Sequence, residues 1–415
     1  MAALNRPPTD FVARLDQILQ GHQEFRRHAI PLCAAETAVS DYVRGFLTDP
    51  IREKYAMGGP VVPQAENFIG AKHVLDLHRL TIDLCREIFG ATYADPRPLS
   101  GTGAVTNLLM TLSEPGQRVL LQTSASGGHA SMGPICRRLG LEIVDLPYDY
   151  ERFNVDSKAC RALLKDPIDF VLFAPSDILY APDFSAVGFP ETTTIVYDAT
   201  QTLGLIATGH LPSPLNAHPR LIVSGGTHKT LPGPSSGLLM TNNVGIAARL
   251  DSELSPKFVR HSHPHHTAAL CATLIEHRAI GSRYSARVRE HAETLAAALS
   301  REGLEVLQDG QRATETHQIF LHVADSELDG AYERAAAAGI TLNTKRKQLF
   351  RDSGLRLGIQ EIARYRWASS DIERLAGVIS AVVADNVDVA ELRPEVYALA
   401  ELNTFADDMC LSVPA

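Results

Sequence analysis

Residues 224–234, the most informative segment of the sequence, read Ser224-Gly225-Gly226-Thr227-His228-Lys229-Thr230-Leu231-Pro232-Gly233-Pro234. The apolar run at residues 221–224 predicts a buried strand at its start. Lys229 therefore follows a buried strand and lies between glycines and small hydroxyl residues. A buried lysine has a lowered pKa and is a ready imine-forming nucleophile. Taken alone, the segment favours a lysine on a surface loop, so its meaning depends on two further features.

The first of these is Asp198, which ends the apolar run at residues 194–197, one strand before Lys229. A carboxylate at the C-terminal end of a strand points into the crevice where α/β sheets bind ligands. A pyridoxal phosphate enzyme needs this pair, because the aspartate keeps the pyridine nitrogen protonated and the lysine holds the aldehyde as an imine. The alternative for Asp198 is a turn or cap residue, which is common at strand ends.

The second feature is a phosphate cradle at Ser100-Gly101-Thr102, at the start of a helix expected over residues 104–113. Small and hydroxyl residues at a helix N-terminus present free N–H groups to an anion. An ordinary helix cap has the same sequence pattern. The cradle, Asp198 and Lys229 nevertheless occur in the order of a fold-type I pyridoxal phosphate enzyme, and this combination supports that function.

The composition is that of a globular protein. Hydrophobic residues make up 45% and charged residues 21% of the 415 residues, which excludes a disordered or fibrous chain. The 39 basic and 48 acidic residues give a net charge of −9, so no basic excess supports a nucleic-acid or membrane partner. We find no run near the ~20 apolar residues of a membrane helix and no signal-peptide pattern. We expect a cytoplasmic protein without metal or disulfides, because its six cysteines are scattered: Cys33, Cys85, Cys136, Cys160, Cys271 and Cys410.

Alternating strands and helices predict an α/β fold. Buried apolar runs separated by long crossovers predict a largely parallel sheet covered on both faces. We expect its strands at residues 118–122, 142–146, 169–173, 193–197, 221–224 and 238–241. Amphipathic patterns predict helices over residues 9–27, 66–89, 266–280, 283–302, 327–338 and 371–384, with further strands at 318–323 and 354–358.

After residue 265 the sequence pattern changes from alternating strands and helices to long amphipathic helices. This change predicts more than one domain. We expect an N-terminal helical arm over residues 1–45, a large cofactor-binding domain over 46–280, and a smaller C-terminal α+β domain over 281–415.

The chain resembles the serine hydroxymethyltransferases and their relatives the L-threonine transaldolases over nearly its whole length. Residues 227–234 are similar to the family's lysine motif, which implies Lys229 as the imine lysine and His228 near the phosphate. Residues 197–201 are similar to its aspartate strand, and Tyr93-Ala94 with residues 100–102 to its phosphate segment. The resemblance implies pyridoxal 5'-phosphate as cofactor and a mostly parallel seven-stranded sheet between helices.

Other motifs imply substrate contacts. Gly354-Leu355-Arg356-Leu357-Gly358 resembles the strand whose arginine binds the substrate carboxylate, which a bidentate guanidinium suits. Taken alone, Arg356 favours an exposed salt bridge. Lys54-Tyr55-Ala56 resembles a motif whose tyrosine reaches the partner subunit's site, which implies a homodimer. Cys33-Ala34-Ala35-Glu36 resembles the family's Ala-Ser-Glu-Asn stretch, and Ser176 falls where the family has a serine near the ring hydroxyl.

The chain also departs from the family. Met57 stands where hydroxymethyltransferases have a glutamate credited with proton transfer, and Gln201 replaces a histidine after the ring aspartate. Ser126 replaces the histidine that stacks on the ring, which leaves His129 as the candidate for that contact. The run at residues 261–266 replaces a glycine-rich inter-subunit loop, and an incidental or phosphate-facing role is favoured there over metal binding. Residues 314–318 look closer to the transaldolases, so use of tetrahydrofolate stays open.

We expect an enzyme that makes or breaks the Cα–Cβ bond of a β-hydroxy-α-amino acid, with an aldehyde or a one-carbon acceptor. Glu36 is the candidate for proton transfer at the β-hydroxyl, and a cap or salt bridge is its alternative role. Two other functions stay open: transamination, racemisation or decarboxylation on the same imine, and a non-catalytic relative retained for binding. A dinucleotide or P-loop enzyme is disfavoured because neither motif is present.

Overall fold

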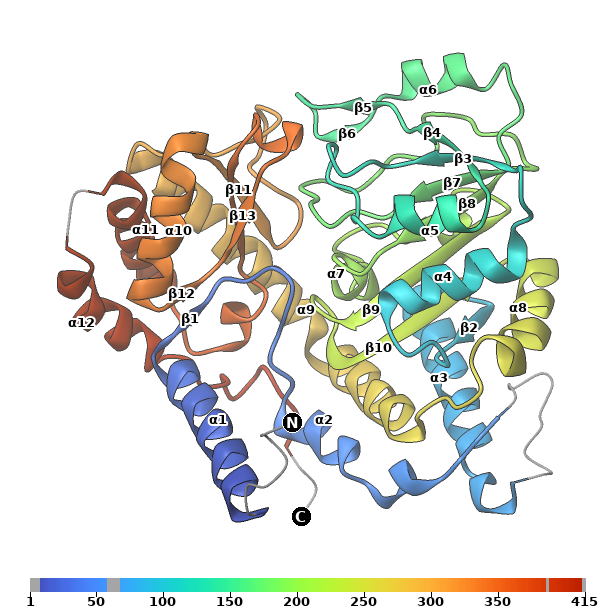
Figure 1. The fold of residues 1–415 in the computed structure, drawn as a ribbon, viewed down its shortest axis with the longest axis horizontal. Helices are drawn as coiled ribbons and strands as arrows, with labels where there is room; N and C mark the ends of the chain where they lie inside the picture. Colours follow the sequence, from blue (N-terminus) through green and yellow to red (C-terminus); the bar gives the residue numbers. More distant parts are fainter. Residues whose placement is uncertain (1–7, 58–67, 386–387, 413–415) are drawn as a thin grey trace, which may run out of the picture.

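The centre of the larger lobe is a seven-stranded sheet with the strand order β2-β10-β9-β8-β7-β3-β4 (Figure 1). The computed structural model describes residues 8–57, 68–385 and 388–412. Every pairing from β9 to β4 is parallel, and β10 runs antiparallel to both β9 and β2. The predicted mostly parallel sheet is therefore confirmed. Its strands are β2 (Tyr93–Asp95), β3 (Arg118–Leu121), β4 (Glu142–Asp145), β7 (Phe170–Phe173), β8 (Thr194–Asp198), β9 (Leu221–His228) and β10 (Pro232–Thr241).

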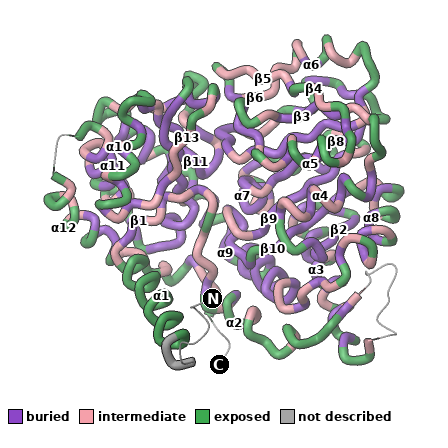
Figure 2. The backbone as a smooth tube through the Cα atoms, viewed as in Figure 1, coloured by how far each residue is buried: buried purple, intermediate pink, exposed green. Residues whose placement is uncertain are grey.

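The central strands are buried on both faces. All five residues of β8 are buried, which is the burial expected of a parallel strand covered by helices on each side. Because side chains alternate along a strand, Ile195 and Tyr197 join one hydrophobic cluster and Val196 joins another. Figure 2 shows this buried layer at the centre of the lobe. The helices of this lobe are α3 (Val74–Phe89), α4 (Gly101–Leu112), α5 (Met132–Arg138), α6 (Ser157–Leu163), α7 (Leu203–Ala207) and α8 (Val244–Lys257), beside a small hairpin of β5 (Tyr148–Asp149) and β6 (Asn154–Val155).

One long helix, α9 (Pro264–Arg301), joins the two lobes (Figure 1). Two helices with a break near residue 281 were predicted, and that prediction was wrong. Gly281 is buried inside the helix, where an added Cβ would lie 2.8 Å from Thr208 Cγ2. The glycine permits close packing there, and a single glycine costs a helix only about 1 kcal/mol. The predicted domain boundary at residue 280 therefore falls inside a continuous helix.

The smaller lobe is built on an antiparallel sheet of order β11-β14-β13. The N-terminal segment also belongs here, because β1 (Ile30–Pro31) pairs in parallel with β12 (Ile340–Thr341). Predicted strands and helices over residues 318–384 are confirmed within a few residues. The elements are β11 (Gln318–His322), β13 (Asn343–Lys345), β14 (Gly354–Gly358), α10 (Asp325–Ala338), α11 (Ser369–Ala384) and α12 (Val389–Ala400).

The first helix, α1 (Pro8–His28), matches the expected one, and α2 (Asp41–Leu47) follows it. The side chains of residues 11–27 in α1 are exposed, as Figure 2 shows. The expected helix over residues 66–89 begins as α3 at Val74, after a short 3₁₀ turn at Ile69–Ala71; residues 66 and 67 lie outside the described residues.

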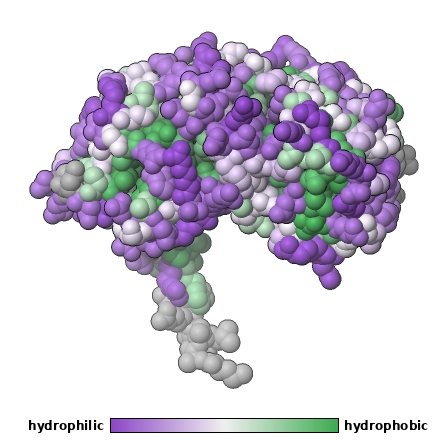
Figure 3. Space-filling model, turned by 90° about the horizontal axis from the view of Figure 1, so that it is seen from above, coloured by the Kyte–Doolittle hydropathy of each residue, from purple (hydrophilic) through white to green (hydrophobic). Residues whose placement is uncertain are grey.

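The face of the molecule in Figure 3 is mainly hydrophilic, with hydrophobic residues gathered in a few separate areas. Within the described ranges, we find no helix with the length and apolar character needed to cross a bilayer.

Candidate active site

Strands β8 and β9 and the N-terminus of α4 meet at one edge of the large sheet. Asp198, the last residue of β8, lies beside Ser224 of β9 in the parallel register. Gly101 begins α4, and an added Cβ there would lie 2.9 Å from the Gly226 amide nitrogen. Only glycine fits this approach, because the obstructing atom is backbone. The structure thus brings together the cradle and the aspartate strand that the sequence pairs with Lys229.

Thr200 holds Asp198 in place. Asp198 is 6% exposed, and its Oδ1 accepts hydrogen bonds from the Thr200 amide at 3.0 Å and from Thr200 Oγ1. Thr200 Oγ1 in turn accepts from the Gly226 amide at 2.7 Å. The carboxylate is therefore fixed by a side chain that also links β8 to β9. Sequence analysis did not single out Thr200, since a threonine two residues after an aspartate is a common turn pattern.

Lys229 directly follows β9 and is partly buried. Burial and the nearby Arg356 guanidinium lower the pKa of Lys229 to about 8, although Asp198 and Asp177 oppose the shift. A larger fraction of its amine is therefore neutral near pH 8 than for an exposed lysine. A neutral amine is the form that attacks a carbonyl carbon.

His228 precedes Lys229, and one nitrogen of its imidazole ring faces the protein interior. Its Nδ1 is buried without a hydrogen-bond partner among the described residues. Burial, with the charge of Lys229 in addition, lowers the pKa of His228 to about 4, so the ring is neutral. A buried, unpaired ring nitrogen beside the α4 cradle suits a ligand with hydrogen-bonding oxygens.

The cradle itself is a capped helix start. Ser100 Oγ accepts a hydrogen bond from the Gly103 amide at 3.0 Å. The amides at the start of an α-helix have no partner within the helix, so those of Gly101 and Thr102 are available to an anion.

His129 lies within the same electrostatic environment. Its Nδ1 accepts a hydrogen bond from the Ser131 amide at 3.2 Å, which leaves Nε2 to carry the proton of the neutral ring. Burial lowers the pKa of His129, against the charge of Asp198, and Lys229 lowers it further. His129 is thus near both groups that would flank the cofactor, and its contact with a cofactor ring stays a prediction.

Gln201 and Ser176 are joined through Gln318 of β11. The Gln318 side-chain amide donates to Gln201 Oε1 at 3.0 Å and to the Ser176 carbonyl at 3.1 Å. These bonds connect the edge of the large sheet to the small lobe. The hydrogen bond between Gln201 and Gln318 therefore helps to fix the two lobes relative to one another at the site.

Arg356 projects from β14 into this junction and is 4% exposed. Its Nη1 donates to the Ser176 carbonyl at 2.7 Å and to Asp177 Oδ1 at 2.9 Å, and its Nη2 donates to Asn343 Oδ1 at 2.6 Å. Its Nε is buried and has no partner among the described residues. Three hydrogen bonds hold the guanidinium, and two of its five N–H donors, including the one on Nε, have no described partner.

Two predicted residues make no described contact with Lys229. Tyr55 is 42% exposed and stacks on His261, with ring centroids 4.8 Å apart. Glu36 lines a cavity of about 1050 Å³ beside α1, together with Glu361. Its role in proton transfer stays a prediction, since no described contact brings its carboxylate to Lys229.

The serine hydroxymethyltransferase family model matches residues 9–166 and 187–379. The chain belongs to this family. Serine hydroxymethyltransferase of Pyrococcus furiosus is 30% identical over 91% of this chain and 92% of its own length. The Methanopyrus kandleri enzyme is 32% identical over 92% and 91%. The crystal structure of an L-threonine transaldolase from Pseudomonas fluorescens has a TM-score of 0.90 at 24% identity, covering 98% of this chain and 95% of that one, which confirms the fold-type I prediction.

Membership in the serine hydroxymethyltransferase family also confirms the predicted class of enzyme. It is a transferase or aldolase-type enzyme that makes or breaks Cα–Cβ bonds of amino acids, and the family implies pyridoxal phosphate. The residues fit that group: an anion-ready helix start, a fixed carboxylate, a lysine of lowered pKa and an unpaired buried His228 nitrogen lie at one sheet edge.

Three charged residues at the site were not predicted. Asp177 follows Ser176, and the lysines Lys345 and Lys347 lie far along the chain, yet all three meet beside Arg356. The spacing of the two lysines was the available signal, because alternate residues of a strand share one face.

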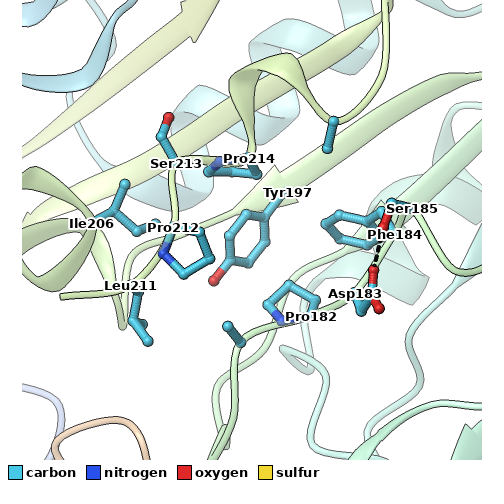
Figure 4. Close-up of a pocket in the computed structure, with 12 residues that line it drawn as sticks. Pro182, Asp183, Phe184, Ser185, Tyr197, Ile206, Leu211, Pro212, Ser213 and Pro214 are labelled. Carbon is cyan, nitrogen blue, oxygen red and sulfur yellow. Dashed lines mark hydrogen bonds between the residues drawn. The ribbon is translucent and has the colours of Figure 1, made fainter. Parts of the chain in front are cut away.

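A second cavity lies behind the sheet. It has a volume of about 200 Å³ and is mainly lined by apolar side chains, with the Tyr197 ring at its centre in Figure 4. Tyr197 and Asp198 are neighbours on β8 and point to opposite faces, so this cavity is separate from the site.

The histidines at residues 261–266 contact one another through their rings. In the part of the chain that the structure describes, no three histidine, cysteine, aspartate or glutamate side chains are grouped as metal ligands.

Proposed function

We propose that this enzyme breaks a β-hydroxy-α-amino acid into glycine and an aldehyde, and rebuilds such amino acids from glycine and another aldehyde. The observation that carries the proposal is the meeting of Asp198 and the α4 cradle at the β9 edge, from which Lys229 directly follows.

Different residues of the site would hold different parts of the cofactor. Ser100, Gly101, Thr102 and His228 would hold the phosphate of pyridoxal phosphate, and Asp198 the ring nitrogen. His129, Ser176 and Gln201 would contact or position the ring. When bound, the cofactor supplies an electron sink for the bond that breaks at Cα.

Lys229 and Arg356 act on the amino acid. Lys229 would exchange places with the substrate amine and move protons at Cα, which its lowered pKa favours. The guanidinium of Arg356 would orient the substrate carboxylate, because its unpaired Nε leaves a donor free. Glu36 and Tyr55 remain candidates for proton transfer and substrate contact, with Tyr55 serving the neighbouring subunit.

Folate-independent exchange between aldehydes is the reaction that we favour. Met57 occupies the position of the family's proton-transferring glutamate, so the side chain credited with handling the hydroxymethyl group is missing. Use of tetrahydrofolate as a one-carbon acceptor is the alternative.

The holoenzyme incubated with L-threonine or L-serine and a second aldehyde is expected to yield a new β-hydroxy-α-amino acid at a rate independent of added tetrahydrofolate. Mass spectrometry of the amino acids, with and without tetrahydrofolate, measures this. Glycine formation that requires tetrahydrofolate would favour the hydroxymethyltransferase reaction, and keto acids or racemised substrate alone would contradict Cα–Cβ chemistry.

We also propose that the enzyme is a homodimer. Helix α1 carries an apolar stripe whose side chains are at least 50% exposed, too large a set of apolar groups for a surface left in water. A second copy of the chain would cover this stripe and bring its own Tyr55 to the site. The stripe consists of Phe11, Val12, Leu15, Ile18 and Leu19.

Replacing Leu15 and Ile18 together by Glu is expected to weaken the dimer at least about tenfold, since each buried aliphatic side chain contributes roughly 1.5–3 kcal/mol. Sedimentation velocity over a range of concentrations measures the shift toward monomer. The matched control is Gln17→Glu, on the opposite face of α1. An unchanged dimer in the double variant would contradict the role of α1.

We propose a cytoplasmic location, because the six free cysteines suit a reducing compartment.

A further inference from the structure

One buried carboxylate near the site is surrounded by three cations. Asp177, whose side chain is 0% exposed, accepts contacts from Lys345 Nζ at 3.0 Å, Lys347 Nζ at 2.7 Å and Arg356 Nη1 at 2.9 Å. The three basic side chains are 14%, 16% and 5% exposed. Asp177 belongs to the larger lobe, in the loop after β7, and the three cations belong to the smaller lobe.

The charges of this cluster do not balance. Three cations against one carboxylate leave a formal excess of two positive charges in a mostly buried place. Among the described residues, Asp177 is the only carboxylate within 4 Å of any of the three. Burial lowers the pKa of Lys345, and Arg356 and Lys347 add to that shift against Asp177. Buried charge of one sign is costly unless an anion is present.

The two lysines are turned toward the site by their spacing. Lys345 ends β13, and Lys347 lies two residues on in extended backbone, so both point to the same side. Arg346, between them, points away and pairs with Asp325 and Asp329 at the surface. Lys345 and Lys347 therefore face the buried Asp177, and Arg346 faces the solvent.

The cluster lies close enough to Lys229 for their charges to interact. Arg356 and Asp177 both act on the pKa of Lys229, and Lys345 and Lys347 both act on that of His129, which also senses Lys229. Each ammonium carries three N–H donors, and the described contacts to Asp177 use one on each lysine. Two N–H donors on each lysine therefore remain beyond those contacts.

A purely structural role would be to join the two lobes through Asp177. One cation suffices for that purpose, and Arg356 already supplies it. Lys345 and Lys347 add electrostatic repulsion to the cluster. A role in connecting the two lobes therefore does not explain why they are present.

From this surplus we infer that Lys345 and Lys347 form a second anion subsite beside Arg356, which binds a second anionic group of a reactant. The group is a carboxylate, phosphate or sulfonate, carried either on the side chain of the amino acid or on the aldehyde. Arg356 takes the α-carboxylate, and the two lysines take the second anion. This inference rests on the proposed function, whose substrate class it narrows to reactants with two negative groups.

The test is an equilibrium titration of the holoenzyme, read from the change in the cofactor's absorption spectrum. In one arm, L-aspartate is compared with L-asparagine, and O-phospho-L-serine with L-serine. In the other arm, glyoxylate is compared with acetaldehyde in the presence of glycine. In one of the two arms, we expect the anionic compound to bind at least about tenfold more tightly than its neutral partner. The arm that shows this preference identifies whether the amino acid or the aldehyde carries the second anionic group.

Changing Lys345 and Lys347 together to Met is expected to abolish this preference, measured as the ratio of the two dissociation constants. Lys347→Arg keeps the charge and is expected to retain the preference even where the double variant fails to fold. Lys257→Met, an exposed lysine on α8, is the matched control.

Equal affinities within every pair in the unmodified holoenzyme would overturn the inference, and so would a preference unchanged in the double variant. Because binding is read at equilibrium, a lack of aldehyde exchange would contradict the proposed reaction alone.

Discussion

Replacing Lys229 by Ala is expected to lower turnover of a β-hydroxy-α-amino acid by at least about a thousandfold. The change removes the amine that would bind the cofactor covalently and would transfer protons at Cα. Its partly buried position and its pKa of about 8 leave more of its amine neutral, and so able to react, than in an exposed lysine. Glycine formation at saturating substrate measures the loss, and the visible absorption band of the purified protein is expected to disappear or shift.

The matched control is Lys165→Ala, an exposed lysine before β7. It is expected to keep both the activity and the band. Full activity in Lys229→Ala, with its melting temperature unchanged, would remove Lys229 from the reaction.

Replacing Asp198 by Asn is expected to reduce turnover by about a hundredfold to a thousandfold, because it removes a fixed negative charge from the reacting system. The amide keeps the shape and the contacts of the carboxylate with Thr200, so folding should be little affected. Steady-state kinetics with saturating cofactor measures the loss in kcat, and the cofactor's absorption spectrum reports whether its ring nitrogen has lost a proton.

Asp166→Asn, an exposed carboxylate before β7, serves as the control and is expected to behave as the unmodified enzyme. If Asp198→Asn changed only the affinity for the cofactor and left kcat intact, Asp198 would be an anchor without an electrostatic role.

The features that local sequence patterns predict well are those that depend on neighbours along the chain. The fully buried β7 and β8 follow from continuous apolar runs. Asp198 could be located because it directly follows such a run, and Lys229 because it follows a strand that begins with one. The continuous α9 was missed because the interruption around Gly281 suggests a break, whereas close packing against Thr208 requires a glycine there.

Contacts across the two lobes could not be predicted in this way. Asp177 and Lys345 are 168 residues apart, and neither stands in a pattern that names the other as its partner. The same holds for Gln201 and Gln318, whose hydrogen bond joins the large sheet to the small one. Such pairs are decided by how the lobes pack, which no local periodicity records.

Tyr55 and Glu36 show the limit of carrying roles over from a resemblance. Each matches its motif, yet in this chain Tyr55 stacks on His261 and Glu36 faces a cavity beside α1. The role of Tyr55 depends on a second copy of the chain, so the dimer experiment bears on it directly, and the role of Glu36 stays a prediction.

The central claim is that Lys229 carries the cofactor in the enzyme. Reduction of the holoenzyme with borohydride fixes pyridoxal phosphate to the amine that it is bonded to, and peptide mass spectrometry then locates it. We expect a pyridoxyl phosphate group on the peptide that contains Lys229. The same group on a different lysine, or none on a holoenzyme that is active, would contradict this role of Lys229.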